Sequence, residues 1–96
     1  MISRQRLLDT FLTMVQVDSP SWAELPMAEW LMNWLKSNGI SAQMDGAGPK
    51  VGSNAGNIVA YIPGEPGSTP LCFAAHMDQI SPCNGVKPIV EGNLVK

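Results

Sequence analysis

The sequence predicts a layered α/β fold in which two N-terminal helices pack on a mixed β-sheet. Two observations lead to this prediction. Apolar residues recur at three- and four-residue steps through most of the first 40 residues, as on one face of a helix. From residue 40 onward they alternate with polar residues or form short continuous runs, as in strands. Amphipathic helices and a sheet bury their apolar faces against one another in such a layered arrangement.

The first helix is predicted from an apolar stripe that begins near residue 7. Leu7, Phe11 and Val15 recur at four-residue steps, and the polar residues between them lie mostly on the opposite face. The helix is expected to end at residues 18–20, Asp-Ser-Pro, because a residue before proline is disfavoured in the α region.

The second helix is predicted from another apolar stripe, and its end is marked by Asn38-Gly39, a typical C-terminal cap. Its start has two interpretations. Ser21 could be the N-cap with Glu24 completing a capping box, or residues 21–25 could form a separate turn with Pro26 as the first helical residue. The second interpretation is favoured because it keeps proline out of the second turn. The stripe consists of Met27, Trp30, Leu31, Trp34 and Leu35.

Strands are predicted after the second helix. Residues 40–44 alternate with a period of two, residues 45–54 are a glycine-rich loop, and residues 57–62 form the next strand. Residues 71–75 form a continuous apolar run, which indicates a central strand covered on both faces. Residues 86–90 and 94–96 are expected to pair as a hairpin.

Composition restricts the class of protein. The chain has 96 residues, of which 45% are apolar and 15% charged, so it is too apolar for a disordered tail. The charged fraction is below the ~25% of typical domains, which fits a surface partly covered by further chain. A net charge of −2 without a run of Lys or Arg offers no basic stripe for nucleic acid. No apolar run approaches the ~20 residues of a membrane span.

The two cysteines and the N-terminus bear on the compartment. Cys72 and Cys83 do not make a disulfide framework. Cys72 lies in the apolar run, where a buried and reduced thiol is expected. Asp9 interrupts the only stretch that resembles a signal peptide. These features predict a cytoplasmic protein.

One histidine and one aspartate form the candidate site. His76 follows the most apolar predicted strand directly, and Asp78 lies two residues further on. Ligands collect at the carboxyl ends of strands in open α/β sheets, and residues two apart on an extended chain point the same way. A neutral imidazole ligates a metal, and a nearby carboxylate orients the ring. The alternative is a polar residue at a strand end without a metal.

Three other sequence patterns give weaker indications of a functional site. Cys83 lies seven residues after His76, but no second cysteine stands at the short spacing of a mixed His/Cys zinc site. The loop at residues 54–57 has glycine and amides without the lysine and following helix of a phosphate-binding loop. Asp18 and Glu24 are interpreted as charges at helix ends.

The segment LCFAAHMDQISPCNGVKPIV, residues 71–90, resembles the corresponding region of peptidase T-like metallopeptidases. These belong to a larger group of two-zinc exopeptidases and deacylases that includes aminoacylase and succinyl-diaminopimelate desuccinylase. Three other blocks agree in order: LLDTFLTMVQVDSPS, the end of the second helix at LKSNG, and AGNIVA before Pro63-Gly64. The resemblance therefore covers nearly the whole chain.

The resemblance implies roles for the candidate residues. His76 corresponds to the first zinc ligand of the family, and Asp78 to the acidic catalytic-site residue that orients this histidine. It implies a site for two zinc ions whose other ligands, and a general-base glutamate, lie outside these 96 residues. Gln79 stands where the family usually has threonine, and the second helix is richer in tryptophan than is usual.

Two hypotheses follow. In the first, residues 1–96 are the N-terminal portion of a zinc-exopeptidase-like catalytic domain that removes residues from the amino end of small peptides, like a tripeptide aminopeptidase. The coding sequence would then continue past Lys96, and the 96 residues alone would be inactive and bind zinc weakly. In the second, the chain is a non-catalytic α/β interaction module that forms homo-oligomers through an exposed strand edge.

Overall fold

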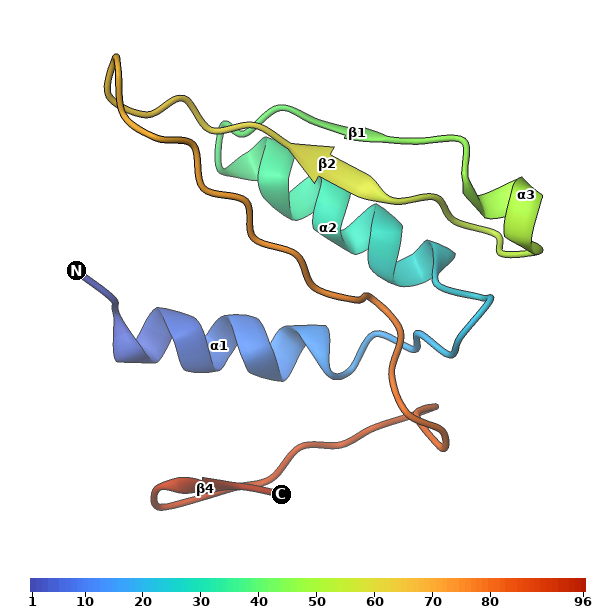
Figure 1. Cartoon of the computed structure of the whole chain (residues 1–96). Coiled ribbons are helices and arrows are strands. Elements are labelled where there is room, and N and C mark those ends of the chain that lie inside the picture. The colour runs from blue at the N-terminus through green and yellow to red at the C-terminus, as the bar shows by residue number, and fades with distance from the viewer.

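A computed structural model describes residues 1–96 as three helices and two separate two-stranded sheets (Figure 1). The fold is therefore α/β, as predicted. The sheets are both antiparallel, so the prediction of a single mixed sheet is wrong. The helices are α1 (Arg4–Met14), α2 (Leu25–Ser37) and α3 (Gly48–Val51). The strands are β1 (Ala42–Met44), β2 (Ile58–Ala60), β3 (Val90–Glu91) and β4 (Leu94–Val95).

Helix α1 begins at a capped end but has no buried residue. The Ser3 hydroxyl accepts a hydrogen bond from the Arg6 amide at 3.2 Å, which satisfies one of the free donors of the first turn. The expected apolar stripe is present, yet Leu7 and Phe11 remain exposed because no other part of the chain covers them. The expectation that both helices pack on a sheet therefore holds only for α2.

Helix α2 confirms the favoured interpretation of its start and the cap at its end. It begins at Leu25 with Pro26 in its first turn, where a missing amide hydrogen costs nothing. At the other end, Gly39 has a φ of +72°, its amide bonds to Lys36 O, and the Ile40 amide bonds to Leu35 O. These two hydrogen bonds together form a Schellman motif.

The first sheet is a hairpin that packs on α2. Strands β1 and β2 pair in the register Ala42–Ala60, Gln43–Val59 and Met44–Ile58, and α2 lies along this pair (Figure 1). The connection predicted as a glycine-rich loop contains the four-residue helix α3, which periodicity cannot reveal in so short a segment. The few buried apolar side chains include Met27 and Ala28 of α2.

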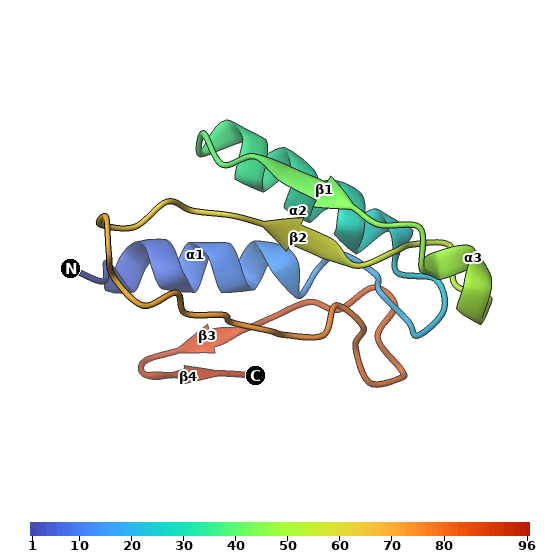
Figure 2. The same cartoon turned by 45° about the horizontal axis from the view of Figure 1, so that its top comes forward.

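The second sheet is the predicted C-terminal hairpin. Val90 pairs with Val95 and Glu91 with Leu94 around a turn in which Gly92 has a positive φ. Figure 2 shows this hairpin on the far side of α1 from β1 and β2.

Residues 71–75 do not form the predicted central strand. They are extended but belong to no sheet, and Leu71 and Phe73 are 81% and 91% exposed. Cys72 is exposed as well, whereas Cys83 is buried, which reverses the expectation for the first thiol. The reason is that no strand of this chain lies within bonding distance of the run, so its backbone has no ladder to join.

The molecule is open for its size. Its accessible surface is 7799 Å², against about 5400 Å² for a compact monomer of this mass. Its radius of gyration is 15.4 Å, against about 12.5 Å. None of the helices has both the length and the apolar character that a membrane crossing requires. The apolar faces that the sequence provides are thus only partly covered by the chain itself.

Candidate metal centre

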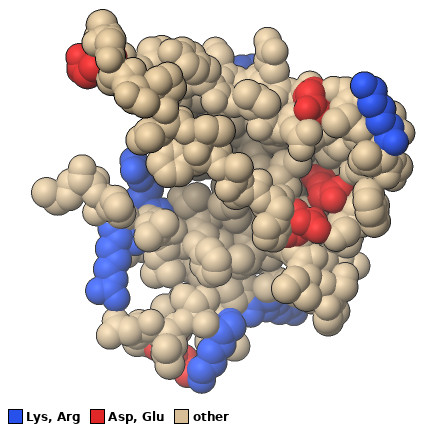
Figure 3. Space-filling model, in the orientation of Figure 1, with Lys and Arg blue, Asp and Glu red and all other residues tan.

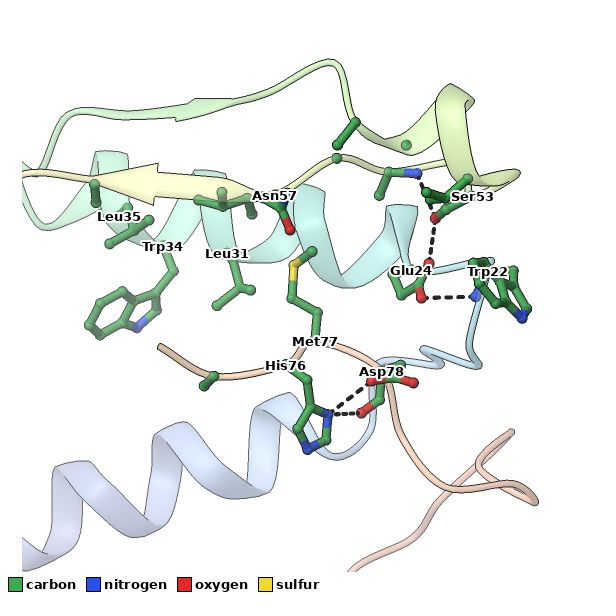
Figure 4. Close-up of a pocket in the computed structure, with 18 of the residues that line it drawn as sticks. Trp22, Glu24, Leu31, Trp34, Leu35, Ser53, Asn57, His76, Met77 and Asp78 are labelled. Carbon is green, nitrogen blue, oxygen red and sulfur yellow. Dashed lines mark hydrogen bonds and ion pairs between the residues drawn. The ribbon is translucent and has the colours of Figure 1, made fainter. Parts of the chain in front are cut away.

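His76 and Asp78 lie on the same side of an extended segment, as their spacing predicts. In Figure 4 the imidazole and the carboxylate point to one side of this segment, and the side chain of Met77 between them points to the other, toward α2. The imidazole Nδ1 lies 2.9 Å from Asp78 Oδ1 and 2.8 Å from the Asp78 backbone oxygen. The structure therefore brings the two candidate residues into direct contact.

These contacts fix which ring nitrogen of His76 carries the hydrogen. A carboxylate oxygen and a carbonyl oxygen can only accept, so Nδ1 must donate to both. In the neutral ring the lone pair is then on Nε2, which is the arrangement that metal-ligating histidines usually have. The His76 side chain is 80% exposed, so this nitrogen is accessible.

The other carboxylate oxygen of Asp78 is held by Ser21. The Ser21 hydroxyl donates to Asp78 Oδ2 at 2.5 Å, so each oxygen of the carboxylate has its own donor. The bond from Ser21, and then the bond and positive charge that His76 can supply, lower the pKa of Asp78 below its ordinary value. Asp78 is therefore an anion at neutral pH.

The linker between α1 and α2 (residues 15–24) holds the backbone of this segment. Ser19 is completely buried; its hydroxyl donates to Met77 O at 2.9 Å, and its carbonyl accepts from the Gln79 amide at 2.7 Å. Pro20 and Gln79 form an isolated parallel bridge. From the residue after Pro20, the Ser21 hydroxyl reaches the side chain of Asp78.

The linker also holds the chain that follows the site. Asp18 Oδ1 accepts from the Gly85 amide at 2.9 Å, so this residue joins two loops and is not simply a charge at a helix end. The linker thus contacts the chain both at residues 77–79 and at residue 85.

A cleft of about 670 Å³ opens next to the site between α2, β2 and residues 73–78. Its walls are mainly apolar side chains, and His76, Met77 and Asp78 lie at one side of it (Figure 4). The apolar lining includes Leu31, Trp34, Leu35, Ile58 and Phe73.

A second carboxylate lines the same cleft. Glu24 accepts from the Trp22 amide at 2.8 Å and from the Ser53 hydroxyl at 2.7 Å. The Ser53 bond is the main cause that lowers the pKa of Glu24. On the face shown in Figure 3, acidic side chains gather beside α3 and the start of α2, while the basic ones lie around the periphery.

The structure contains no complete set of metal ligands. No group of three His, Cys, Asp or Glu side chains comes close enough together to hold a metal ion. The chemistry of the donors nevertheless fits zinc at one position, since His76 presents an accessible Nε2 and a carboxylate on its other nitrogen.

The sequence interpretation missed the two serines of the linker. The sequence indicates Ser21 only as a possible helix cap, but its hydroxyl bonds to Asp78, 57 residues away, and Glu24 accepts from the Trp22 amide instead. For Ser19 the sequence indicates only a place in the turn that ends the first helix. The block ending in VDSPS, which carries part of the resemblance, was the one available signal for them.

Comparisons with known proteins give two relatives. Over 96 residues the chain is 34% identical to the uncharacterized protein YqjE of Bacillus subtilis, matching all of this chain and 26% of that protein. Over 108 residues it is 26% identical to the cytosol non-specific dipeptidase of Escherichia coli, matching 99% of this chain and 21% of that protein. No protein-family model and no solved structure matches. The chain is thus distantly similar to part of a dipeptidase, and it spans about a quarter of the length of these relatives.

Proposed function

We propose that this chain forms the N-terminal part of a zinc-dependent exopeptidase that hydrolyses small peptides from the amino end. His76 is the zinc ligand of this segment, and Asp78 orients it. The substrate class follows the dipeptidase to which the chain is similar, and di- and tripeptides are both candidates. That relative is named for the cytosol, and we propose the same compartment.

The contact between His76 and Asp78 carries this proposal. A bond from Nδ1 to a carboxylate and an exposed Nε2 are what a ligating histidine needs, and both occur here at one side of a cleft of about 670 Å³. The similarity to a dipeptidase spans the residues on both sides of the contact.

Zinc bound at such a site would polarise the scissile carbonyl and lower the pKa of a water molecule. The chain's own residues have simpler tasks. Asp78 keeps Nδ1 protonated and the imidazole in one orientation, and the linker between α1 and α2 keeps both residues at the side of the cleft. The remaining ligands, and a group that removes a proton from water, must come from outside the 96 residues, since no group of three possible ligands forms within them.

The test uses the longer product expected from the coding sequence. It would be incubated with an alanyl dipeptide, an alanyl tripeptide and the N-acetylated form of each, with zinc and with a chelator. We expect hydrolysis of the free peptides only, because an exopeptidase of this kind needs the free amino end. Cleavage of the acetylated forms alone would contradict the aminopeptidase proposal in favour of a deacylase.

A matched pair of variants connects the activity to this segment. His76→Ala is expected to abolish hydrolysis, while Lys87→Ala, which removes another exposed side chain from the same stretch, is expected to have no effect. Equal activities in the two variants would show that His76 is not a ligand.

A second candidate function is self-association without catalysis. It is favoured by the exposed apolar surface, above all the unpaired run at residues 71–75. An extended edge with free amide and carbonyl groups pairs readily with a second copy.

Sedimentation of the 96-residue chain over a hundredfold range of concentration tests this alternative. Self-association through the run would disappear when Phe73, 91% exposed, is replaced by Lys, because a charge on the edge opposes pairing. A monomer at every concentration would remove this candidate.

A further inference from the structure

We propose that the Ser21 hydroxyl positions His76 by fixing the carboxylate of Asp78, and so selects the ring nitrogen that faces outward. This inference rests on the proposed function for its meaning, since a fixed Nε2 is useful only to a ligand. Its geometry stands independently of any metal. A residue that is not itself a ligand would then determine the state of the ligand.

The first step is the rotation of the carboxylate. The terminal torsion of aspartate is broad, so one hydrogen bond leaves the group free to turn. Asp78 has two, because Oδ2 accepts from Ser21 and Oδ1 accepts from His76 Nδ1. With Oδ2 held, Oδ1 is directed at the imidazole.

The second step is that Ser21 is available for this task. Its hydroxyl makes no bond to helix α2, whose first amide, that of Leu25, donates to the Asn54 side chain instead. Its one hydrogen bond goes to Asp78. Ser21 is also exposed, so its hydroxyl is not required to fill the interior.

The third step is the precision of the arrangement. Ser19 is bonded to residues 77 and 79 on both sides of Asp78, so the linker cannot slide relative to the site. Ser19 holds the backbone of residues 77–79, and Ser21 holds the side chain of Asp78. The two serines thus have separable functions.

One competing explanation needs a test. The Asp78 backbone oxygen also accepts from Nδ1, at 2.8 Å, and could by itself keep the hydrogen on this nitrogen. In that case Ser21 would have no influence on the ring. Removal of the hydroxyl distinguishes the two explanations.

The experiment measures the tautomer of His76, the only histidine of the 96 residues, by long-range ¹H–¹⁵N NMR at a pH near 8 without metal. The wild-type ring is expected to carry its hydrogen mainly on Nδ1. In Ser21→Ala the equilibrium should move about threefold toward Nε2–H, the low end of what one hydrogen bond contributes. Ser53→Ala, which removes a serine–carboxylate bond elsewhere along the cleft, should change nothing.

Ser21→Thr and Ser21→Val make the test independent of how well the alanine variant folds, because they have the same shape and differ in the hydroxyl. Thr should behave as the wild type and Val as Ala. Equal tautomer ratios in Ser21→Thr and Ser21→Val would overturn the proposal. A wild-type His76 ring with the same tautomer ratio as free imidazole in water would overturn it as well. The ratio is read without metal or substrate, so an inactive longer product would refute the proposed function and leave this result unaffected.

Discussion

Replacing Ser19 by Ala should weaken the fold at the point where the linker meets the site. Ser19 is completely buried, and its hydroxyl donates to Met77 O, 58 residues further along the chain. Without this donor the partly buried carbonyl loses its partner, which costs about 1–2 kcal/mol of unfolding free energy. The loss is larger than for a surface bond because water cannot easily replace the hydroxyl.

The assay is urea unfolding followed by tryptophan fluorescence. A small protein that exposes little surface on unfolding has a slope of about 1 kcal/mol per molar urea, so the midpoint should fall by about 1–2 M. Thr13→Ala is the matched control: its hydroxyl also donates to a carbonyl, at 2.8 Å, but on the exposed side of α1. That change should stay within about 0.5 kcal/mol. Equal midpoints for the two variants would refute the assignment of Ser19 as a tertiary support.

Three further outcomes are expected. Gly56→Ala should cost about 1–3 kcal/mol or more in thermal or urea unfolding, because an added Cβ would lie 2.1 Å from Asp45 O. Gly46→Ala, with no atom within 4 Å of the added Cβ, should be neutral, and an equally damaging change there would contradict this explanation. The hydrogen bond from the Asn57 side chain is the main cause that lowers the pKa of Asp45. The Asp45 carboxylate therefore stabilises the fold fully above the ordinary aspartate pKa near 4, and this stabilisation is lost as the pH falls through the lower pKa of the folded state. Urea midpoints of the wild type and Asp45→Asn should accordingly converge between pH 5 and pH 2, and a constant difference would show that the charge is not involved. Zinc titration by calorimetry should reveal at most weak binding to the 96 residues, and tight one-to-one binding that survives His76→Ala would place the site elsewhere.

Local signals predicted the local structure. The stripes of α1 and α2, the Asn38-Gly39 cap and the C-terminal hairpin all depend on residues close in sequence, and the structure contains each of them. The i and i+2 spacing of His76 and Asp78 likewise sufficed to place them side by side, since it needs only an extended backbone.

Long-range packing could not be predicted in the same way. The run at residues 71–75 has the composition of a central strand, but a strand also needs neighbours, and here it has none. Whether Cys72 is buried depends on the same neighbours. The contact of Ser21 with Asp78 joins residues far apart in sequence. A serine just before a helix is normally interpreted as a helix cap, so this local pattern gives no indication of the tertiary hydrogen bond.

The zinc content of the longer product, with and without His76, tests the central claim most directly. After dialysis against metal-free buffer, the wild type should retain zinc, and His76→Ala should retain less and lose peptide hydrolysis with it. Lys87→Ala should match the wild type in both. Equal zinc content and equal activity in wild type and His76→Ala would contradict the claim that this segment supplies a ligand.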